Sequence, residues 1–455
     1  MIVPGNKPSF ASRCLAAAVL AWTAGLVALP AAASVPAADS AAAIRALAEF
    51  EDACRSTKPL WSVDLCGPIV LVDPRTRMAV TNRPDPAGRF APRDGAFVGE
   101  WPADMPVANT SIDWEDTRWA MILLPLPEDA FSRLRLIAHE SFHRIQPELG
   151  HDPADALLPH LDEEQGRVWL RLEIRALGRA IATEGAGARA AVLDALLFRA
   201  ARYAEFPGAD SLERRLEGHE GLAEYTGVRF ALDVTGPDPE LVTELLDAFE
   251  RRPTYVRSLG YGTGPALGLL LDRYRPGWRD MIGPEPDLDR RLARAVGAPL
   301  ADSRAQAVRD AALQRGAAYG ADIVRAEEQE RAQRRAADLE VYRKVLVEGP
   351  TLTVELPDRL LLFNPNTVLP LGDEGNVYPG AILMGDWGRL TLEDGAALGN
   401  ADRSRARVAA PQSPEPGHAG LVEGPGWTLE LEAGWHLVPG DRPGDFRLAR
   451  VDAEH

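Results

Sequence analysis

The sequence predicts an α+β fold in which a small N-terminal β-containing lobe and a mainly helical region precede a C-terminal all-β module. Two patterns support this prediction. Residues 162–347 contain several long stretches with apolar side chains at helical spacing. Beyond Gly349, short β-type runs are separated by Pro, Gly, Asn and Asp. The 455 residues are 46% hydrophobic and 26% charged, which is typical of a globular protein with a large core.

The first 38 residues differ from the rest of the chain. Lys7 and Arg13 precede an apolar run that ends in small residues, a pattern typical of a secretory signal and its cleavage site. We therefore expect residues 1–38 to be removed and the mature protein to be exported, either periplasmic or secreted. The apolar run is almost long enough to span a bilayer, so an uncleaved anchor is the alternative. Gly25, Pro30 and the alanine cluster favour cleavage.

The charge balance limits the kinds of partner. The formal net charge is −17, and removal of the leader makes the remaining chain two charges more negative. Such an acidic surface argues against nucleic acid or an anionic membrane as the main partner. We therefore expect no membrane partner after signal cleavage. The sequence leaves the oligomeric state open.

The mature chain keeps two cysteines, Cys54 and Cys66. In an oxidising compartment, two cysteines this close most simply form one disulfide. A zinc site built from cysteines is improbable with so few thiols.

The pattern divides the chain into a leader (1–38), a middle part (39–348) and a β-rich module (349–455). Within the middle part, residues 39–127 form the β-containing lobe and residues 128–348 the helical region. The apolar run Trp119–Pro127 has strand length and ends in prolines. Glu128 and Asp129 suit a helix N-terminus, and Pro147 should end that helix.

Further helices are expected at 163–182, 188–206, 211–233, 239–252, 264–274 and 325–347. The third of these contains Gly218 and Gly221, which should distort it. The last is heavily charged with mixed signs, so we interpret it as the solvated face of a long helix, with a coiled interaction arm as the alternative. Strands are expected at 351–356, 359–363, 381–385, 389–393, 427–432 and 446–450.

The stretch LRLIAHESFHRIQPELG, residues 134–150, carries the main functional signal. His139 and His143 are four residues apart on one helical face, so both can reach a single metal ion. Glu140 lies about 100° around the helix, close enough to contact a water on that metal. The alternative is two ordinary histidines without a ligand. A catalytic zinc also needs a third protein ligand and one open position.

Several residues can be considered as the third ligand. Metzincins place glycine and histidine three and six residues after the second histidine, but Gln146 and Leu149 occupy those positions here. His151 and His160 lie beyond Pro147 without matching spacing.

A better candidate lies in EGHEGLAEYTG, residues 217–227. Glu220 and Glu224 are four apart on one predicted helical face. One carboxylate can bind zinc while the other accepts a hydrogen bond from the second N–H of a histidine ligand. His219 competes with Glu220 as the third ligand.

The motifs His139-Glu140-Ser-Phe-His143 and Glu220-Gly-Leu-Ala-Glu224 resemble those of gluzincin zinc metallopeptidases, the thermolysin-like or peptidase MA-like kind. The resemblance covers roughly residues 110–285, and only the two motifs are specific. It implies a zincin-like domain in which His139, His143 and Glu220 bind one zinc ion per chain. It also implies that Glu140 is the base and that Glu224 orients a ligand.

The resemblance further implies that the strand Trp119–Pro127 is an edge strand above the zinc, where such enzymes bind a peptide backbone. A donor must also stabilise the developing oxyanion. Tyr225 and Tyr261 are candidates for this catalytic role. The alternatives are that Tyr225 packs in the core and that Tyr261 belongs to a glycine-rich turn.

The resulting hypothesis is an exported zinc-dependent peptidase that hydrolyses peptide or protein substrates with a zinc-bound water activated by Glu140. A second hypothesis is a non-catalytic zinc-binding or interaction protein that keeps the gluzincin fold. A third is a helical interaction protein with accidental motifs. The intact Glu140 favours the first hypothesis, because a purely structural site has no use for a base beside an open position.

Overall fold

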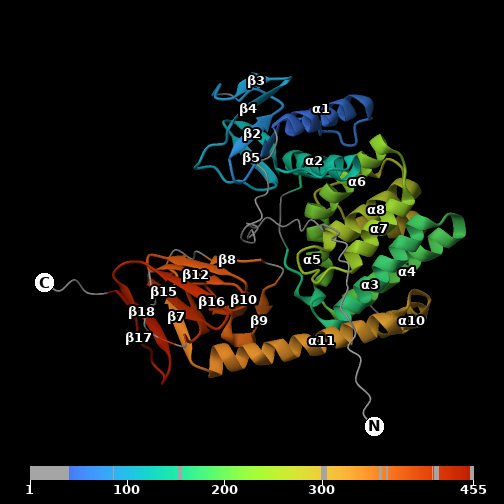
Figure 1. Ribbon diagram of the computed structural model, residues 1–455. Helices are drawn as coiled ribbons and strands as arrows, with labels where there is room; N and C mark the ends of the chain where they lie inside the picture. Colours follow the sequence, from blue (N-terminus) through green and yellow to red (C-terminus); the bar gives the residue numbers. More distant parts are fainter. Residues whose placement is uncertain are drawn as a thin grey trace, which may run out of the picture.

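The fold is described from a computed structural model that covers residues 40–450, apart from 86, 152–155, 299–304, 358–360, 365–366, 412 and 414–419. The expected leader, residues 1–38, therefore lies outside the described residues. The α+β prediction is confirmed: a small β region and a central set of helices are followed by C-terminal β-sheets (Figure 1).

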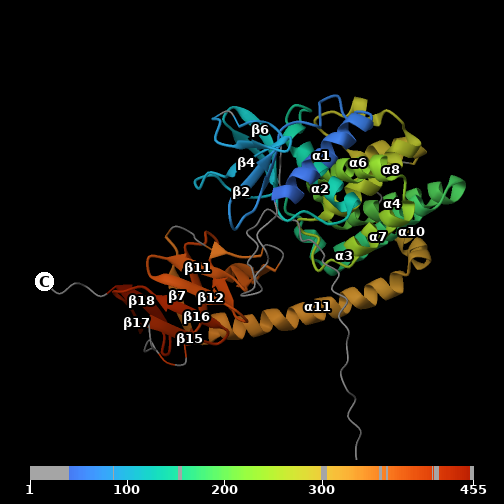
Figure 2. The same cartoon turned by 45° about the horizontal axis from the view of Figure 1, so that its top comes forward.

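The N-terminal region combines one helix with a mixed sheet. Its elements are α1 (Ser40–Ser56), β1 (Ile69–Val72), β2 (Met78–Thr81), β3 (Ala91–Arg93), β4 (Ala96–Glu100), β5 (Thr110–Trp114) and β6 (Thr117–Leu123). Within the described residues, the strand order is β3-β4-β2-β1-β6-β5. The β1–β6 pair is parallel, and the other neighbours are antiparallel. Helices α1 and α2 (Ala130–Ile145) contact strands of this sheet (Figures 1 and 2).

The expected edge position of Trp119–Pro127 is wrong. The strand exists as β6, but it lies between β1 and β5, so β5 is the edge. The physical reason is burial: Trp119 to Ile122 are buried on both faces, which suits an interior strand. The polar Thr110, Ser111 and Asp113 suit the edge strand β5.

The helices form the centre of the molecule. They are α2, α3 (Glu164–Ala182), α4 (Gly185–Glu205), α5 (Ala209–Leu216), α6 (Leu222–Thr235), α7 (Pro239–Glu250), α8 (Leu259–Tyr274), α9 (Leu288–Val296), α10 (Ala305–Gly316) and α11 (Ala321–Arg343). One continuous apolar core joins these helices to α1 and to one face of the N-terminal sheet. The opposite face of that sheet carries its own cluster around Trp101, Trp114 and Trp119.

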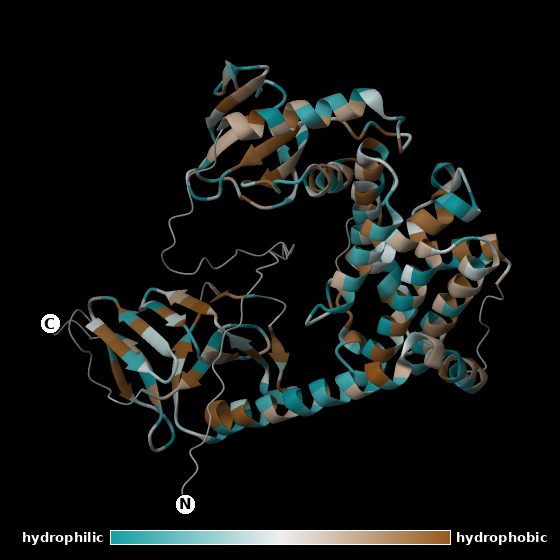
Figure 3. Cartoon of the chain, turned by 45° about the vertical axis from the view of Figure 1, so that its right-hand side comes forward, coloured by the Kyte–Doolittle hydropathy of each residue, from teal (hydrophilic) through white to brown (hydrophobic). Residues whose placement is uncertain are grey.

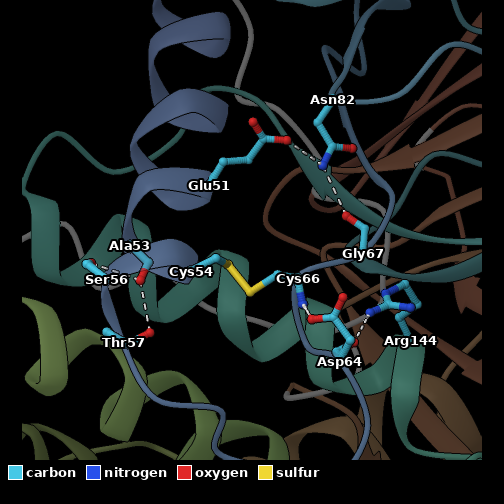
Figure 4. Close-up of a disulfide and its surroundings, with 10 residues drawn as sticks. All are labelled: Glu51, Ala53, Cys54, Ser56, Thr57, Asp64, Cys66, Gly67, Asn82 and Arg144. Carbon is cyan, nitrogen blue, oxygen red and sulfur yellow. Dashed lines mark hydrogen bonds between the residues drawn. A yellow bond between two sulfur atoms is a disulfide. The ribbon is translucent and has the colours of Figure 1, made fainter.

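The predicted disulfide is confirmed. Cys54, near the end of α1, is bonded to Cys66, shortly before β1 (Figure 4). The loop between them contacts the helix that carries His139 and His143, because Arg144 of α2 donates a hydrogen bond to the Asp64 carbonyl. A Cβ atom at Gly67 would lie 2.2 Å from the Arg144 guanidinium carbon, so a larger residue there would displace the end of that side chain.

The C-terminal region is built from strands. They are β7 (Thr351–Glu355), β8 (Leu361–Leu362), β9 (Leu369–Pro370), β10 (Asn376–Pro379), β11 (Ile382–Gly385), β12 (Gly388–Leu392), β13 (Ala396–Gly399), β14 (Arg405–Ala409), β15 (Leu421–Gly424), β16 (Trp427–Leu431), β17 (Trp435–Pro439) and β18 (Phe446–Arg450). Within the described residues they form two sheets, ordered β17-β18-β7-β14-β13-β10-β9 and β15-β16-β12-β11-β8. Their inward side chains, including Leu352, Trp387 and Trp427, form a separate core.

Helix α11 connects the helical region to these sheets (Figure 1). Arg331 and Arg335 near its middle both pair with Asp162, which precedes α3. Toward its end, Leu339 and Tyr342 pack against an apolar cluster of the β module. The hydropathy colouring shows that α11 is largely polar along its length (Figure 3). Across the described part of the chain, no helix combines the length and apolar character that crossing a membrane requires.

Candidate metal centre

The helix that carries the two histidines begins and ends where the sequence predicts. The Asp129 side chain caps α2 by accepting a hydrogen bond from the Ser132 backbone N–H at 2.8 Å. The helix ends at Ile145, two residues before Pro147. The apolar residues of α2 lie in the central core. As a result, His139 and His143 are held inside the molecule on a rigid element.

Three ligand atoms converge at one point. The Nε2 atoms of His139 and His143 are 3.1 Å apart. The Glu220 Oε2 atom lies 3.6 Å from each of them. Tetrahedral zinc ligands at their usual bond lengths lie about 3.3 Å from one another. These three residues are therefore spaced as a group that could hold one metal ion.

The His139 tautomer is set by Glu224. His139 Nδ1 lies 2.8 Å from Glu224 Oε2, and a carboxylate can only accept. Nδ1 must carry the proton, so the lone pair of the neutral ring is on Nε2. Glu224 is held in turn by the Arg135 guanidinium, whose Nε lies 2.6 Å from Glu224 Oε1. Burial raises the pKa of Glu224, but Arg135 and His139 outweigh burial and lower it to about 2.

The His143 tautomer is set by Gln146. The Gln146 Nε2 atom donates to the carbonyls of Gly218 and His219, at 3.0 and 3.2 Å. This fixes the amide orientation, so its Oε1 atom faces His143 Nδ1 at 3.0 Å. His143 must then donate through Nδ1, which leaves its Nε2 lone pair directed at the same point as that of His139.

This arrangement requires a cation. Two lone pairs and a carboxylate oxygen face one another, and Glu220 Oε2 is buried without a hydrogen-bond donor. In the metal-free protein, a proton can serve as the cation. Burial lowers the pKa of His139, but the nearby Glu220 carboxylate and the hydrogen bond to Glu224 outweigh burial and raise it to about 10. Two imidazoles and one carboxylate also form a donor set that zinc accepts, so the residues fit a metal ion.

Glu220 is presented by a π-helical turn, η2 (Glu217–Gly221), which joins α5 to α6. The expected distortion near Gly218 and Gly221 is thus confirmed, and such turns occur frequently at functional sites. Glu217 anchors the turn from behind. It is 1% exposed and receives hydrogen bonds from Arg199 at 2.6 and 2.9 Å and from the Thr263 hydroxyl at 2.6 Å.

Helix α8 lies in direct backbone contact with this turn. A Cβ atom at Gly264 would lie 2.3 Å from the Gly221 Cα atom, and one at Gly260 would lie 2.9 Å from the Gly221 nitrogen. Real Cβ atoms do not approach this closely, so glycine is needed at both α8 positions. The glycine-rich stretch therefore holds η2, and with it Glu220, at a fixed distance from α8.

Glu140 is buried next to the ligands and is not one of them. Its side chain is 2% exposed, and its Oε2 atom has no hydrogen-bond partner among the described residues. Burial raises the pKa of Glu140 above its ordinary value, although His139 and His143 act in the opposite direction. A raised pKa makes a carboxylate a stronger proton acceptor than an ordinary one.

The two candidate tyrosines occupy different places. The Tyr261 ring stacks on His139, with centroids 5.6 Å apart and planes 9° apart. Burial raises the pKa of Tyr261, and the negative charge of the nearby Glu220 raises it further. The Tyr225 hydroxyl instead donates to Asp272 at 2.9 Å and accepts from Arg279, away from the ligand atoms. Tyr225 is fully buried in this polar cluster.

The other histidines considered as ligands lie outside the triad. His219 borders it, with Nε2 3.3 Å from Glu220 Oε1 and Nδ1 3.3 Å from Gln146 Oε1. His160 is 2.7 Å from Glu213 Oε1 in a separate buried cluster. His151 Nδ1 faces the Pro284 carbonyl at 3.4 Å.

Two functional neighbours were not identified from the sequence. Gln146 was considered only as a residue that breaks the metzincin pattern, and Arg135 was not considered. Both positions follow from helical spacing, because Arg135 is four residues before His139 and Gln146 is three residues after His143. Helical neighbours with polar side chains were the available signal.

No protein-family model, curated protein or solved structure matches this chain in the comparisons made. The case for the site therefore depends on the contacts among its own residues.

Proposed function

We propose that this protein is an exported zinc-dependent peptidase of the gluzincin kind. The single observation that carries the proposal is the buried Glu140 carboxyl group beside three converging ligand atoms, with an Oε2 atom that has no hydrogen-bond partner among the described residues. A metal site that only stabilises the fold needs no such group. The resemblance of the two motifs to gluzincins supports the same choice.

His139, His143 and Glu220 would hold the metal ion, and Glu224 and Gln146 would keep the two imidazoles in the binding tautomer. When bound, zinc supplies a Lewis acid and lowers the pKa of water to about 7. Glu140 would accept the proton of the attacking water and pass it to the leaving amine. Its raised pKa suits a group that must both take and return a proton.

Tyr261 is the favoured donor to the developing oxyanion. Its ring rests on His139, and its high pKa keeps the hydroxyl protonated at neutral pH, so it can donate a hydrogen bond. Tyr225 is not assigned this role, because Asp272 and Arg279 already engage its hydroxyl.

The test compares the parent, produced without residues 1–38, with Glu140→Gln and Glu220→Ala. We expect about one metal ion per chain in the parent, full metal in Glu140→Gln and marked loss in Glu220→Ala. Hydrolysis of a broad peptide mixture should fall by about 10²- to 10⁴-fold in Glu140→Gln. The exposed Glu148, mutated to Gln, is the matched control.

The outcomes separate the hypotheses. Metal binding without hydrolysis of any peptide would favour a non-catalytic zinc-binding protein. A folded parent that binds no zinc would contradict both readings and leave a helical interaction protein.

A further inference from the structure

A cavity of about 250 Å³ opens beside His139, between α2, α6, α7 and α8. Most of its wall is apolar, with side chains from Leu136, Val228, Val242, Leu246 and Phe249. It also contains the guanidinium groups of Arg135 and Arg252 and the ring of Tyr261. The cavity is thus an apolar space with two cations next to the candidate metal ligands.

Arg252 differs from its neighbour in the cavity. Arg135 is paired with the Glu224 carboxylate. No carboxylate of the described residues forms an ion pair with Arg252, which instead lies beside two aromatic rings. Its guanidinium carbon is 5.2 Å from the Phe249 centroid and 5.8 Å from the Tyr261 centroid. These contacts hold the cation in place and leave its hydrogen-bond donors available.

Burial lowers the pKa of Arg252, which reflects the cost of keeping an unpaired cation away from water. That cost falls when an anion enters the cavity. Charge balance points in the same direction. Three carboxylates surround the centre, whereas a divalent metal, Arg135 and Arg252 together carry four positive charges.

We propose that this cavity binds a carboxylate group of the substrate through Arg252, with an apolar part of the substrate against the α7 wall. The inference rests on the proposed peptidase function and adds a substrate class to it. A guanidinium and a carboxylate can form two parallel hydrogen bonds, which gives direction as well as affinity. The carboxylate can come from a peptide C-terminus or from an acidic side chain.

The experiment measures binding in the full-length mature chain loaded with zinc and carrying Glu140→Gln, so that ligands are not consumed. The probes are N-acetylphenylalanine, its C-terminal amide, and N-acetylglutamic acid α-amide, studied by calorimetry. We expect at least one free carboxylate to bind about 10- to 100-fold more tightly than N-acetylphenylalanine amide. Which of the two carboxylates binds identifies its source.

In an added Arg252→Met variant this preference should disappear, whereas Arg252→Lys should keep part of it. Arg251→Met is the matched control, because Arg251 is the adjacent exposed arginine, and it should keep the full preference. Zinc content and circular dichroism establish that each variant is folded. If Arg252→Met does not fold, the test is whether Arg252→Lys has a weaker preference for the carboxylate probes than the parent.

Equal binding of carboxylate and amide probes would overturn the proposal. So would a preference that survives Arg252→Met and is lost on metal removal, since the carboxylate would then bind the metal. These outcomes are independent of hydrolysis. If the preference depends on Arg252 but the parent protein shows no peptidase activity, the carboxylate site is supported and the peptidase function is rejected. If the parent is an active peptidase without the preference, the peptidase function is supported and the carboxylate site is rejected.

Discussion

Single side chains decide which ring nitrogen of each neutral histidine carries the proton. The Gln146 amide group is oriented by its hydrogen bond to the Gly218 carbonyl, so its oxygen accepts the Nδ1 proton of His143. Glu224 does the same for His139 with a carboxylate. The pair shows that two chemically different groups perform one task, and that the amide also ties α2 to the η2 turn.

The first prediction concerns Gln146→Met, which keeps the volume and removes the amide. His143 loses the acceptor of its Nδ1 proton, so zinc affinity should fall by about 10- to 100-fold. Competition with a chromogenic chelator measures the change. The exposed Glu148→Gln serves as control, and an unchanged affinity in Gln146→Met would show that the amide does not orient His143.

The second prediction concerns the pH dependence of metal binding. The pKa of His139 in the metal-free protein is raised to about 10, so the site holds a proton at neutral pH. Metal must displace that proton, and apparent affinity should therefore rise with pH, by about tenfold per unit between about pH 6 and about pH 8. Calorimetry in buffers of different ionisation enthalpy should detect about one proton released per metal. Binding without proton release would contradict the raised pKa.

The four-residue spacing rule correctly predicted which residues share a helical face. It did not predict where the two candidate tyrosines lie. His139, His143 and Glu220 come together as expected. Tyr225 directly follows Glu224 and therefore points about 100° away from it, toward Asp272. Tyr261 reaches the site through the packing of α8 on η2, which a motif search does not describe.

At the scale of elements, the contact between α8 and η2 sets the position of Glu220. The third prediction is that Gly264→Ala places a methyl group against Gly221, 2.3 Å from its Cα atom. Overpacking of this kind should cost about 1–3 kcal/mol of unfolding free energy. Because the turn must move, zinc affinity should fall as well.

Gly178→Ala is the matched control for this substitution. Gly178 lies inside α3, and the nearest atom to its added Cβ would be Leu246 Cδ1 at 3.9 Å. The control should raise the unfolding free energy by about 0.4–1 kcal/mol. Urea denaturation measures both variants. Equal effects of the two substitutions would mean that the α8–η2 contact is not tight.

The fourth prediction concerns a buried ionic cluster between α3, α4 and α5. Glu213 Oε1 lies 2.6 Å from Arg202 Nε and 2.7 Å from His160 Nε2. Burial raises the pKa of Glu213, but Arg202 and His160 outweigh burial and hold it well below its ordinary value. A carboxyl group whose pKa is lowered by folding stabilises the protein above its unfolded pKa, near 4.3, and this contribution is lost as the pH falls further.

Glu213→Gln should therefore lose less stability than the parent between about pH 6 and about pH 3. At neutral pH the variant should be less stable by about 3–5 kcal/mol, because the buried Arg202 loses one of its two carboxylate partners and keeps only Glu173. Urea titrations at several pH values test both effects, with the exposed Glu244→Gln as control. Parallel pH profiles for Glu213→Gln and the parent would exclude Glu213 as a source of acid sensitivity.

Element boundaries were predicted well where a capping residue or proline marks them, as for Asp129 and Pro147 at the ends of α2. Strand order was not predictable in the same way. The apolar run of β6 indicates that this strand is buried. Its own sequence does not indicate that it pairs with β1 and β5, because strand pairing depends on residues elsewhere in the chain. The edge position of that strand was consequently wrong.

At the scale of the whole molecule, composition and periodicity were sufficient for the α+β class. The disulfide also followed from the presence of only two cysteines after the expected leader. Composition and periodicity said less about how the parts are joined. The charged stretch 325–347 was interpreted as a solvated helix face, and most of it forms α11, whose two ends contact different regions.

The attachment of α11 at both ends has a geometric consequence. The Asp162 contacts of Arg331 and Arg335 and the packing of Leu339 leave only a short free stretch between them. A helix is a screw, so one residue inserted there would rotate the β module by about 100° and advance it by about 1.5 Å. Seven inserted residues would nearly restore the original orientation of the β module and would move it about 10 Å farther along the helix axis. The length of α11 thus sets both the rotation of the β module about the helix axis and its distance from the helical region.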